Sequence, residues 1–123
     1  MASTANLFID QGTDFSVMIT LKDQDGNVMD LTIPDEVIIR AQFRKSYQSS
    51  TAVNFTTSII DAASGIIELS LLPDTTSEIR PGRYVYDVEL TSLYLNEELE
   101  PISSQKVRVI EGIVVLTPEV TQT

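Results

Sequence analysis

Four runs of the sequence alternate apolar and polar residues with a period of two. They span residues 15–21, 37–44, 67–71 and 84–90. In the last run, for example, Tyr86 and Val88 flank Asp87. Since successive side chains of a strand point to opposite faces, each run predicts a β-strand with one buried and one solvated face, as in antiparallel sheets.

Four further strands are expected at residues 7–9, 28–31, 53–60 and 107–116, which are rich in apolar and β-branched residues. The last of these is almost continuously apolar from Val109 to Leu116. Either both of its faces are covered by the chain itself, or one face is covered by another chain. Gly112 within it predicts a bulge or a close approach of another backbone segment.

Turn residues separate these strands. Residues 23–27 and 62–65 contain glycine among Asp, Asn or Ser and predict two hairpins. Residues 72–79 predict one helical turn with Asp74 as its N-cap. Residues 92–104 lack a clear pattern, apart from a weak helical tendency over 93–100. We therefore expect a long loop there that is either mobile or held by a partner.

Short strands separated by turns predict an all-β fold. We expect a two-sheet antiparallel immunoglobulin-like sandwich of about seven to nine strands, with one short helical turn. An open barrel is the alternative. The 123 residues form a single domain, 1–123, in this interpretation. Tyr84, at the start of its strand, is expected to cap a crossing between the sheets, as in the tyrosine corner of such sandwiches.

The composition argues against catalysis and against zinc. The chain has no His, no Cys and no Trp, so it lacks an imidazole base, a thiolate nucleophile and the usual zinc ligands. The Asp23/Asp25 turn does not fit a calcium loop, because Leu21 stands at its first ligand position. Asp87 and Glu89 share a strand face, where we expect Arg or Lys across the strands. We predict no enzyme, no cofactor and no metal site.

The charge narrows the class of partner. A formal net charge of -10 with a pI of about 4.2 disfavours nucleic acids and anionic membranes as partners. No signal peptide and no membrane-spanning stretch is apparent. Much of the basic charge is concentrated in a few residues, either as charge balance or as a patch that docks an acidic partner. They are Arg40, Arg44, Lys45, Arg80 and Arg83.

Several segments together resemble small virion proteins of tailed phages, especially contractile-tailed phages of marine cyanobacteria. These segments are residues 8–15, 23–27, 30–32, 41–45, 80–91, 108–115 and 117–120. The layout is also similar to the immunoglobulin-like N-terminal domain of phage baseplate upper proteins. The chain departs from this family at residues 33–36 and 93–105, where the family usually has short turns. Both departures fall in expected loops, so they bear on the partner rather than on the fold.

The resemblance implies a non-catalytic structural protein of the virion, in the tail or baseplate, made in the host cytoplasm. Its expected partners are other virion proteins, with copies of the chain in a symmetric assembly. A capsid decoration protein on the head is the alternative. A host-glycan-binding module, with Tyr47 and Tyr94 as candidates, is a weaker one. The candidate interface residues are Val109, Ile110, Ile113, Val115, Leu93, Tyr94 and Leu95.

Overall fold

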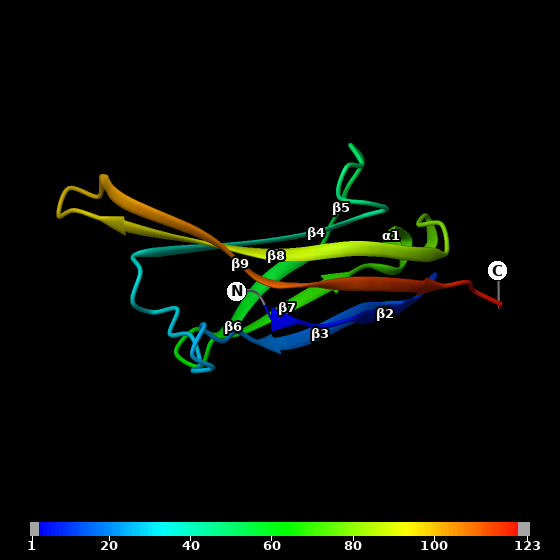
Figure 1. Cartoon of the computed structure of the whole chain (residues 1–123), viewed down its shortest axis with the longest axis horizontal. Coiled ribbons are helices and arrows are strands. Elements are labelled where there is room, and N and C mark those ends of the chain that lie inside the picture. The colour runs from blue at the N-terminus through cyan, green and yellow to red at the C-terminus, as the bar shows by residue number, and fades with distance from the viewer. Residues whose placement is uncertain (1–2, 121–123) are drawn as a thin grey trace.

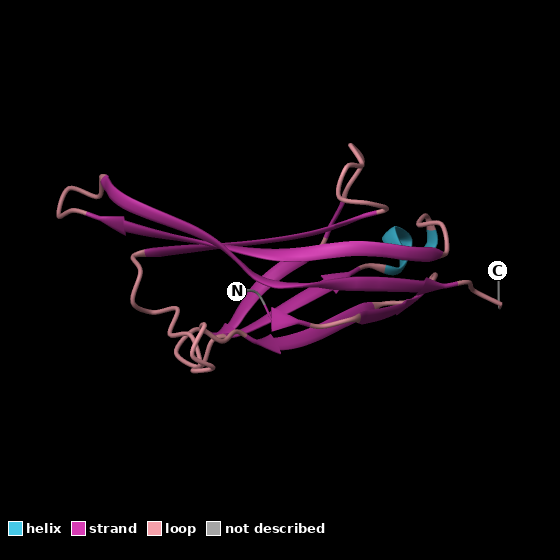
Figure 2. Ribbon diagram, in the orientation of Figure 1, coloured by secondary structure: helices cyan, strands magenta, loops and turns pink. Residues whose placement is uncertain are grey.

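Two β-sheets packed face to face form the body of the protein in the computed structural model, which describes residues 3–120 (Figures 1 and 2). The larger sheet comprises β1 (Ser3–Thr4), β2 (Leu7–Asp10), β4 (Glu36–Arg44), β5 (Val53–Asn54), β8 (Gly82–Leu95) and β9 (Pro101–Thr117). The smaller sheet comprises β3 (Phe15–Thr20), β6 (Thr56–Asp61) and β7 (Ile66–Leu71). One short helix, α1 (Pro73–Ser77), connects β7 to β8.

The strand order confirms the immunoglobulin-like sandwich. The larger sheet runs β1-β9-β8-β4-β5, with β2 also paired to β9, and the smaller sheet runs β3-β7-β6. The three strands of the smaller sheet thus face β4, β8 and β9 of the larger one, as in immunoglobulin domains. The expectation of a wholly antiparallel fold was wrong in one respect, because β1 and β2 run parallel to β9.

The alternating residues of both sheets meet in one hydrophobic core. Its fully buried members include Phe43, Tyr86 and Val88 of the larger sheet, and Ile67 and Leu69 of the smaller one. Burial of apolar side chains on this scale is the main force that holds two sheets together.

Phe55 lies at the centre of an aromatic cluster in this core. Its ring centroid lies 5.2 Å from that of Phe43 and 6.2 Å from that of Tyr86. The expected single strand over residues 53–60 is divided at Phe55, because the chain crosses from β5 in the larger sheet to β6 in the smaller one.

The connection between the sheets after β7 is a tyrosine corner, as predicted. The hydroxyl of Tyr84 donates a hydrogen bond to the carbonyl oxygen of Arg80. The N-cap of α1 is Leu72 and not Asp74, which lies in the first turn of the helix. The reason is Pro73: a residue before proline is restricted to extended conformations, so Leu72 cannot join the helix.

The predicted hairpins at residues 23–27 and 62–65 are present, with Gly26 and Gly65 at positive φ. The predicted strand over residues 28–31 is absent apart from a single bridge between Lys22 and Val28. The Asp30 carboxylate accepts a hydrogen bond from the backbone N–H of Thr32 at 2.9 Å, and this local turn replaces a strand.

Gly112 of β9 permits the close backbone approach that the sequence predicted. A Cβ at this position would lie 2.0 Å from the carbonyl oxygen of Ala5. The same oxygen accepts a 2.6 Å hydrogen bond from the hydroxyl of Tyr86. The N-terminal segment is thereby fixed against β9. Within residues 3–120, no helix is long and apolar enough to cross a membrane.

Candidate protein-interaction site

A long β-hairpin projects from one end of the sandwich (Figures 1 and 2). It is formed by the end of β8 and the beginning of β9, and we call residues 91–106 the arm. Leu93 pairs with Ser104, Tyr94 with Ser103, and Leu95 with Pro101. The expectation of an unpatterned loop or a helix over these residues was therefore wrong. The strands continue here without a core to face, so the sequence shows no sustained apolar alternation.

The outer part of the arm is a two-stranded ribbon. The first residue of β4, Glu36, pairs with Leu93, and within residues 3–120 no third strand flanks the ribbon beyond that point. The Asp35 carboxylate accepts a 2.6 Å hydrogen bond from the backbone N–H of Leu95, the last residue of β8 before the tip turn, and thus supports the β8 strand of the ribbon. Isolated two-stranded hairpins are only marginally stable, and their free edges are templates for pairing with other chains.

The turn at the tip of the arm is organised by Asn96. Its side-chain oxygen accepts hydrogen bonds from the backbone N–H groups of Glu98 and Glu100, both at 2.9 Å. Leu99 adopts a left-handed conformation, with a φ of 62°, and its side chain is 77% exposed. That conformation costs a residue other than glycine roughly 1–2 kcal/mol. The turn thus holds a large apolar side chain in solvent, between glutamates.

The candidate interface residues do not form one surface. Leu93, Tyr94 and Leu95 lie on the arm and are partly exposed. Val109 and Ile110 are buried in the core of the chain, with 7% and 3% of their surface exposed. Neither can offer its side chain to a partner in this conformation, so their selection as interface residues was wrong.

A bulge in β9 explains the burial of these two neighbours. Val88 of β8 pairs with Ile110, and the next residue of β8, Glu89, pairs with Arg108. Val109 is therefore an additional residue without a partner on β8. The other two candidates, Ile113 and Val115, are partly exposed and pair with Val85 and Arg83 of β8. They lie on the outer face of the larger sheet.

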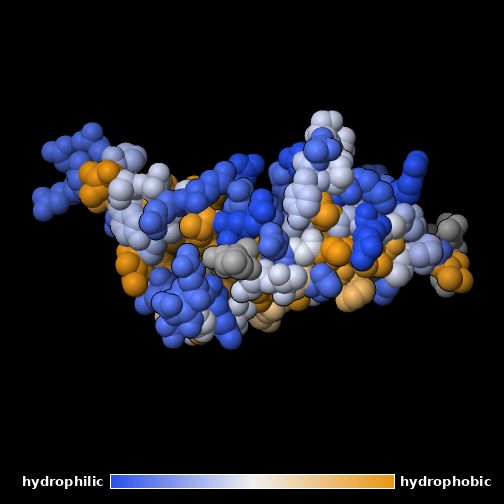
Figure 3. Space-filling view, viewed as in Figure 1, coloured by the Kyte–Doolittle hydropathy of each residue, from blue (hydrophilic) through white to orange (hydrophobic). Residues whose placement is uncertain are grey.

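Sequence reasoning missed the two most exposed apolar residues of the arm. Leu99 lies in the tip, and Ile102 follows in β9 with 65% of its surface exposed. One signal could have indicated the turn: an Asn side chain often accepts a hydrogen bond from the backbone two residues later. Asn96 does so here, directly before Glu97 and Glu98. In Figure 3 the free end of the arm is hydrophilic, with hydrophobic surface directly behind it.

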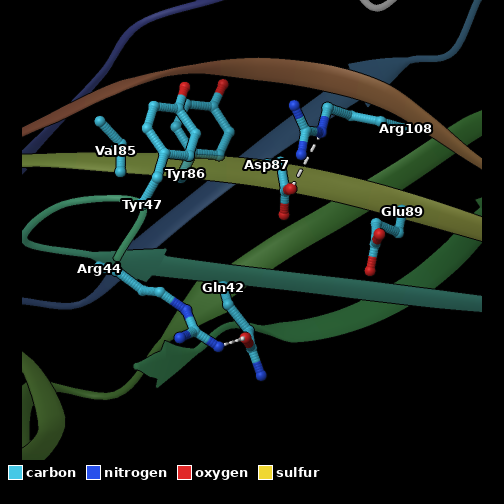
Figure 4. A pocket seen from close by; sticks show the side chains of 8 residues that line it. All are labelled: Gln42, Arg44, Tyr47, Val85, Tyr86, Asp87, Glu89 and Arg108. Atoms are coloured by element: carbon cyan, nitrogen blue, oxygen red, sulfur yellow. Dashed lines mark hydrogen bonds and ion pairs between the residues drawn. The ribbon is translucent and has the colours of Figure 1, made fainter. Parts of the chain in front are cut away.

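The outer face of the larger sheet carries a ladder of charges (Figure 4). As predicted, Asp87 and Glu89 have basic partners on the neighbouring strand: Arg108 lies 3.1 Å from Asp87, and Lys106 lies 3.6 Å from Glu89. Arg108 also lies 3.3 Å from Glu111. The carboxylates border a hollow of about 210 Å³. Exposed pairs of this kind contribute little stability, about 0–1 kcal/mol each.

The two tyrosines considered for glycan binding lie far apart. Tyr47 is 65% exposed and lies in the loop between β4 and β5. This loop follows Arg44, which pairs with Val85 near the start of β8. Tyr94 lies at the other end of β8, in the arm. The structure therefore does not combine them into one aromatic platform.

Comparisons with known proteins identify no family. No protein-family model matches the chain, and no curated protein matches it significantly. Among solved structures, the chain is similar to AggA, the major subunit of aggregative adherence fimbriae type I from Escherichia coli. The sequences are 12% identical, the TM-score is 0.43, and the match covers 94% of this chain and 91% of that chain.

Proposed function

We propose that the chain is a non-catalytic structural protein of a tailed-phage virion, a component of the tail or baseplate that acts through protein–protein assembly. The observation that carries this proposal is the arm, which projects from a closed sandwich (Figure 1). The resemblance of residues 8–15, 80–91 and 108–115 to small virion proteins supplies the setting.

The arm is suited to assembly because its parts are incomplete in isolation. Within residues 3–120 the β9 edge of its outer ribbon is unpaired, and an added strand from a neighbour can pair with such an edge. Leu99 and Ile102 expose apolar surface that a neighbour can bury. The tip turn is already ordered through Asn96, so little conformational freedom would be lost on docking.

The rest of the chain supports a passive role. Asp87 and Glu89 are the carboxylates nearest to a hollow on the sheet surface, and both are ion-paired with side chains of β9. Each individual contact through the arm would be weak. Many copies around a symmetric tail or baseplate would multiply such contacts into a stable assembly. The chain would be made in the host cytoplasm and become part of the particle there.

Fractionation of virus particles tests this proposal. Particles of the virus that encodes the chain are purified and separated into heads and tails, and the chain is quantified in each fraction by mass spectrometry. We expect the chain in the tail fraction at a fixed ratio to the tail proteins. Recovery in the head fraction would instead support capsid decoration. Absence from particles would refute a structural role in the virion.

A further inference from the structure

The tip of the arm is a concentrated acidic surface. Glu97, Glu98 and Glu100 are all exposed there, around the exposed side chain of Leu99. Across residues 3–120, no ion pair involves any of these three glutamates. Their charges are thus available to a partner, and their mutual repulsion favours a basic surface opposite them.

A basic cleft lies at the opposite end of the molecule. Arg44, Lys45 and Arg80 line it together with a single acidic residue, Glu78, and it encloses about 510 Å³. In the described part of the chain, none of the three cations forms an ion pair. The cleft therefore has an excess of positive charge on a protein whose net charge is -10.

The walls of the cleft are partly apolar. Val53, Ile79 and Tyr84 contribute to its lining. The ammonium group of Lys45 lies 5.0 Å from the centroid of the Tyr84 ring, and Arg44 donates a hydrogen bond to the carbonyl oxygen of Ser49. The cations are thus held at the rim of a cavity that could also accept an apolar side chain.

The tip cannot reach the cleft of its own chain. Arg44, in the cleft, pairs with Val85, and β8 then continues to Leu95 at the end of the arm. A strand of this length spans about 33 Å at roughly 3.3 Å per residue. Figure 1 shows the arm and the α1 corner at opposite ends of the long axis. A contact between the two surfaces must therefore join two molecules.

We propose that the arm tip of one copy docks into the basic cleft of the next copy, head to tail. Glu97 and Glu98 would lie opposite Lys45 and Arg80, while Leu99 enters the apolar part of the cleft. Such a contact uses different surfaces on the two partners, so it generates a ring or a filament rather than a closed dimer. The inference extends the proposed assembly function by naming the partner as a second copy of the chain.

Charge exchange between the two surfaces tests the proposal. The tip variant carries Glu97→Lys and Glu98→Lys, and the cleft variant carries Lys45→Glu and Arg80→Glu. Self-association is measured by sedimentation velocity at low salt, where screening is weakest. We expect the wild-type chain to self-associate and each variant alone to do so at least tenfold more weakly. An equimolar mixture should recover association, because each tip then meets a cleft of opposite charge.

A matched control separates this contact from a general effect of net charge. Asp25→Lys with Glu68→Lys makes the same charge change as the tip variant, but outside both surfaces, and should leave self-association intact. The proposal is overturned if the mixture does not recover association. It is also overturned if the wild-type chain stays monomeric at concentrations on the order of 1 mM, which tethering in a particle can supply. If the cleft variant lost binding to other virion proteins while the tip variant bound them normally, the cleft would bind a different acidic partner and not the arm tip.

The outcome is distinguishable from that of the proposed function. Particle fractionation reports where the chain is located, and it does so whether or not two copies touch. A chain found in tails whose charge-exchange variants do not complement one another would retain the assembly role and lose the head-to-tail contact.

Discussion

Leu99 combines an unfavourable backbone conformation with an exposed apolar side chain. Its φ of 62° suits glycine, and its side chain is 77% exposed. Neither property stabilises the isolated chain. Both are understandable if the side chain is buried by a neighbour in an assembly, because strained residues often lie at functional sites.

Replacement of Leu99 by glycine should separate stability from assembly. Glycine adopts the left-handed conformation without strain, so we expect the free energy of unfolding in urea to be unchanged or higher by up to about 1 kcal/mol. Incorporation into particles should fall at least tenfold, as measured by mass spectrometry of purified virions. Met18→Ala, which removes a 64% exposed side chain from β3, is the control and should incorporate normally. Normal incorporation of the Leu99→Gly variant would exclude the Leu99 side chain from the contact.

Tyr86 fixes the N-terminal segment and gives the protein a defined response to alkaline pH. Burial raises the pKa of the Tyr86 phenol to about 12, from an ordinary value of about 10. The folded chain keeps this proton where the unfolded chain has lost it. The stabilising contribution is therefore complete below about pH 10 and is lost as the pH rises towards about 12.

The Tyr86→Phe variant should lose this part of the pH dependence. At neutral pH we expect a loss of about 1 kcal/mol, because the hydrogen bond to the Ala5 carbonyl is removed. The free energy of unfolding, measured in urea, should then fall less steeply between about pH 8 and about pH 11 for the variant than for the wild type. Burial also raises the pKa of Tyr84, so some slope will remain. Tyr47→Phe, in an exposed loop, should match the wild type, whereas equal slopes for wild type and Tyr86→Phe would contradict this account.

At the scale of elements, the strands with one buried face were predictable and the others were not. The runs that became β3, β4, β7 and the inner part of β8 alternate with a period of two, apart from single apolar residues such as Met18 and Ile38, because every second side chain points towards the core. The arm has no core on either face, so its residues do not alternate in a way that the sequence reveals. Its strands are recognisable only from the pairing between β8 and β9.

The structure separates the seven candidate interface residues into partly exposed and buried groups. Leu93, Tyr94 and Leu95 were expected in a contact segment, and they do lie on the arm. Val109 and Ile110 look equally apolar in sequence, but the bulge in β9 turns both into the core. A bulge depends on the facing strand, so a local pattern could not separate these two groups. The positive φ of Leu99 was equally hidden, since leucine is not a residue that signals a left-handed turn.

Removal of the outer arm should leave the sandwich folded. The register pairs Leu93 with Ser104, so residues 94–103 can be replaced by Asn-Gly, which favours a tight hairpin turn. The core ends at Leu90 and Val109, so we expect the free energy of unfolding to change by no more than about 1 kcal/mol. Incorporation into particles should be abolished. A loss of more than about 3 kcal/mol would instead make the arm a part of the folding core.

Opposite charges are concentrated at the two ends of the molecule. Glutamates cluster at the arm tip, and arginines and a lysine cluster about the cleft near α1, at the other end of β8. The sequence shows which residues carry these charges but not how far apart they lie, because that distance depends on β8 running through the full length of the larger sheet. A molecule with opposite charges at its two ends is suited to the head-to-tail assembly that we propose, in which the sandwich would separate the two contacts.

A cryo-electron microscopy reconstruction of the intact virus particle is the decisive test of an assembly role for the arm, since it shows both the location of the chain and the surroundings of its arm. We expect density for the sandwich in the tail or baseplate, with residues 94–103 in contact with a neighbouring protein. A particle without this density, or a chain whose arm extends freely into solvent in every copy, would contradict this expectation.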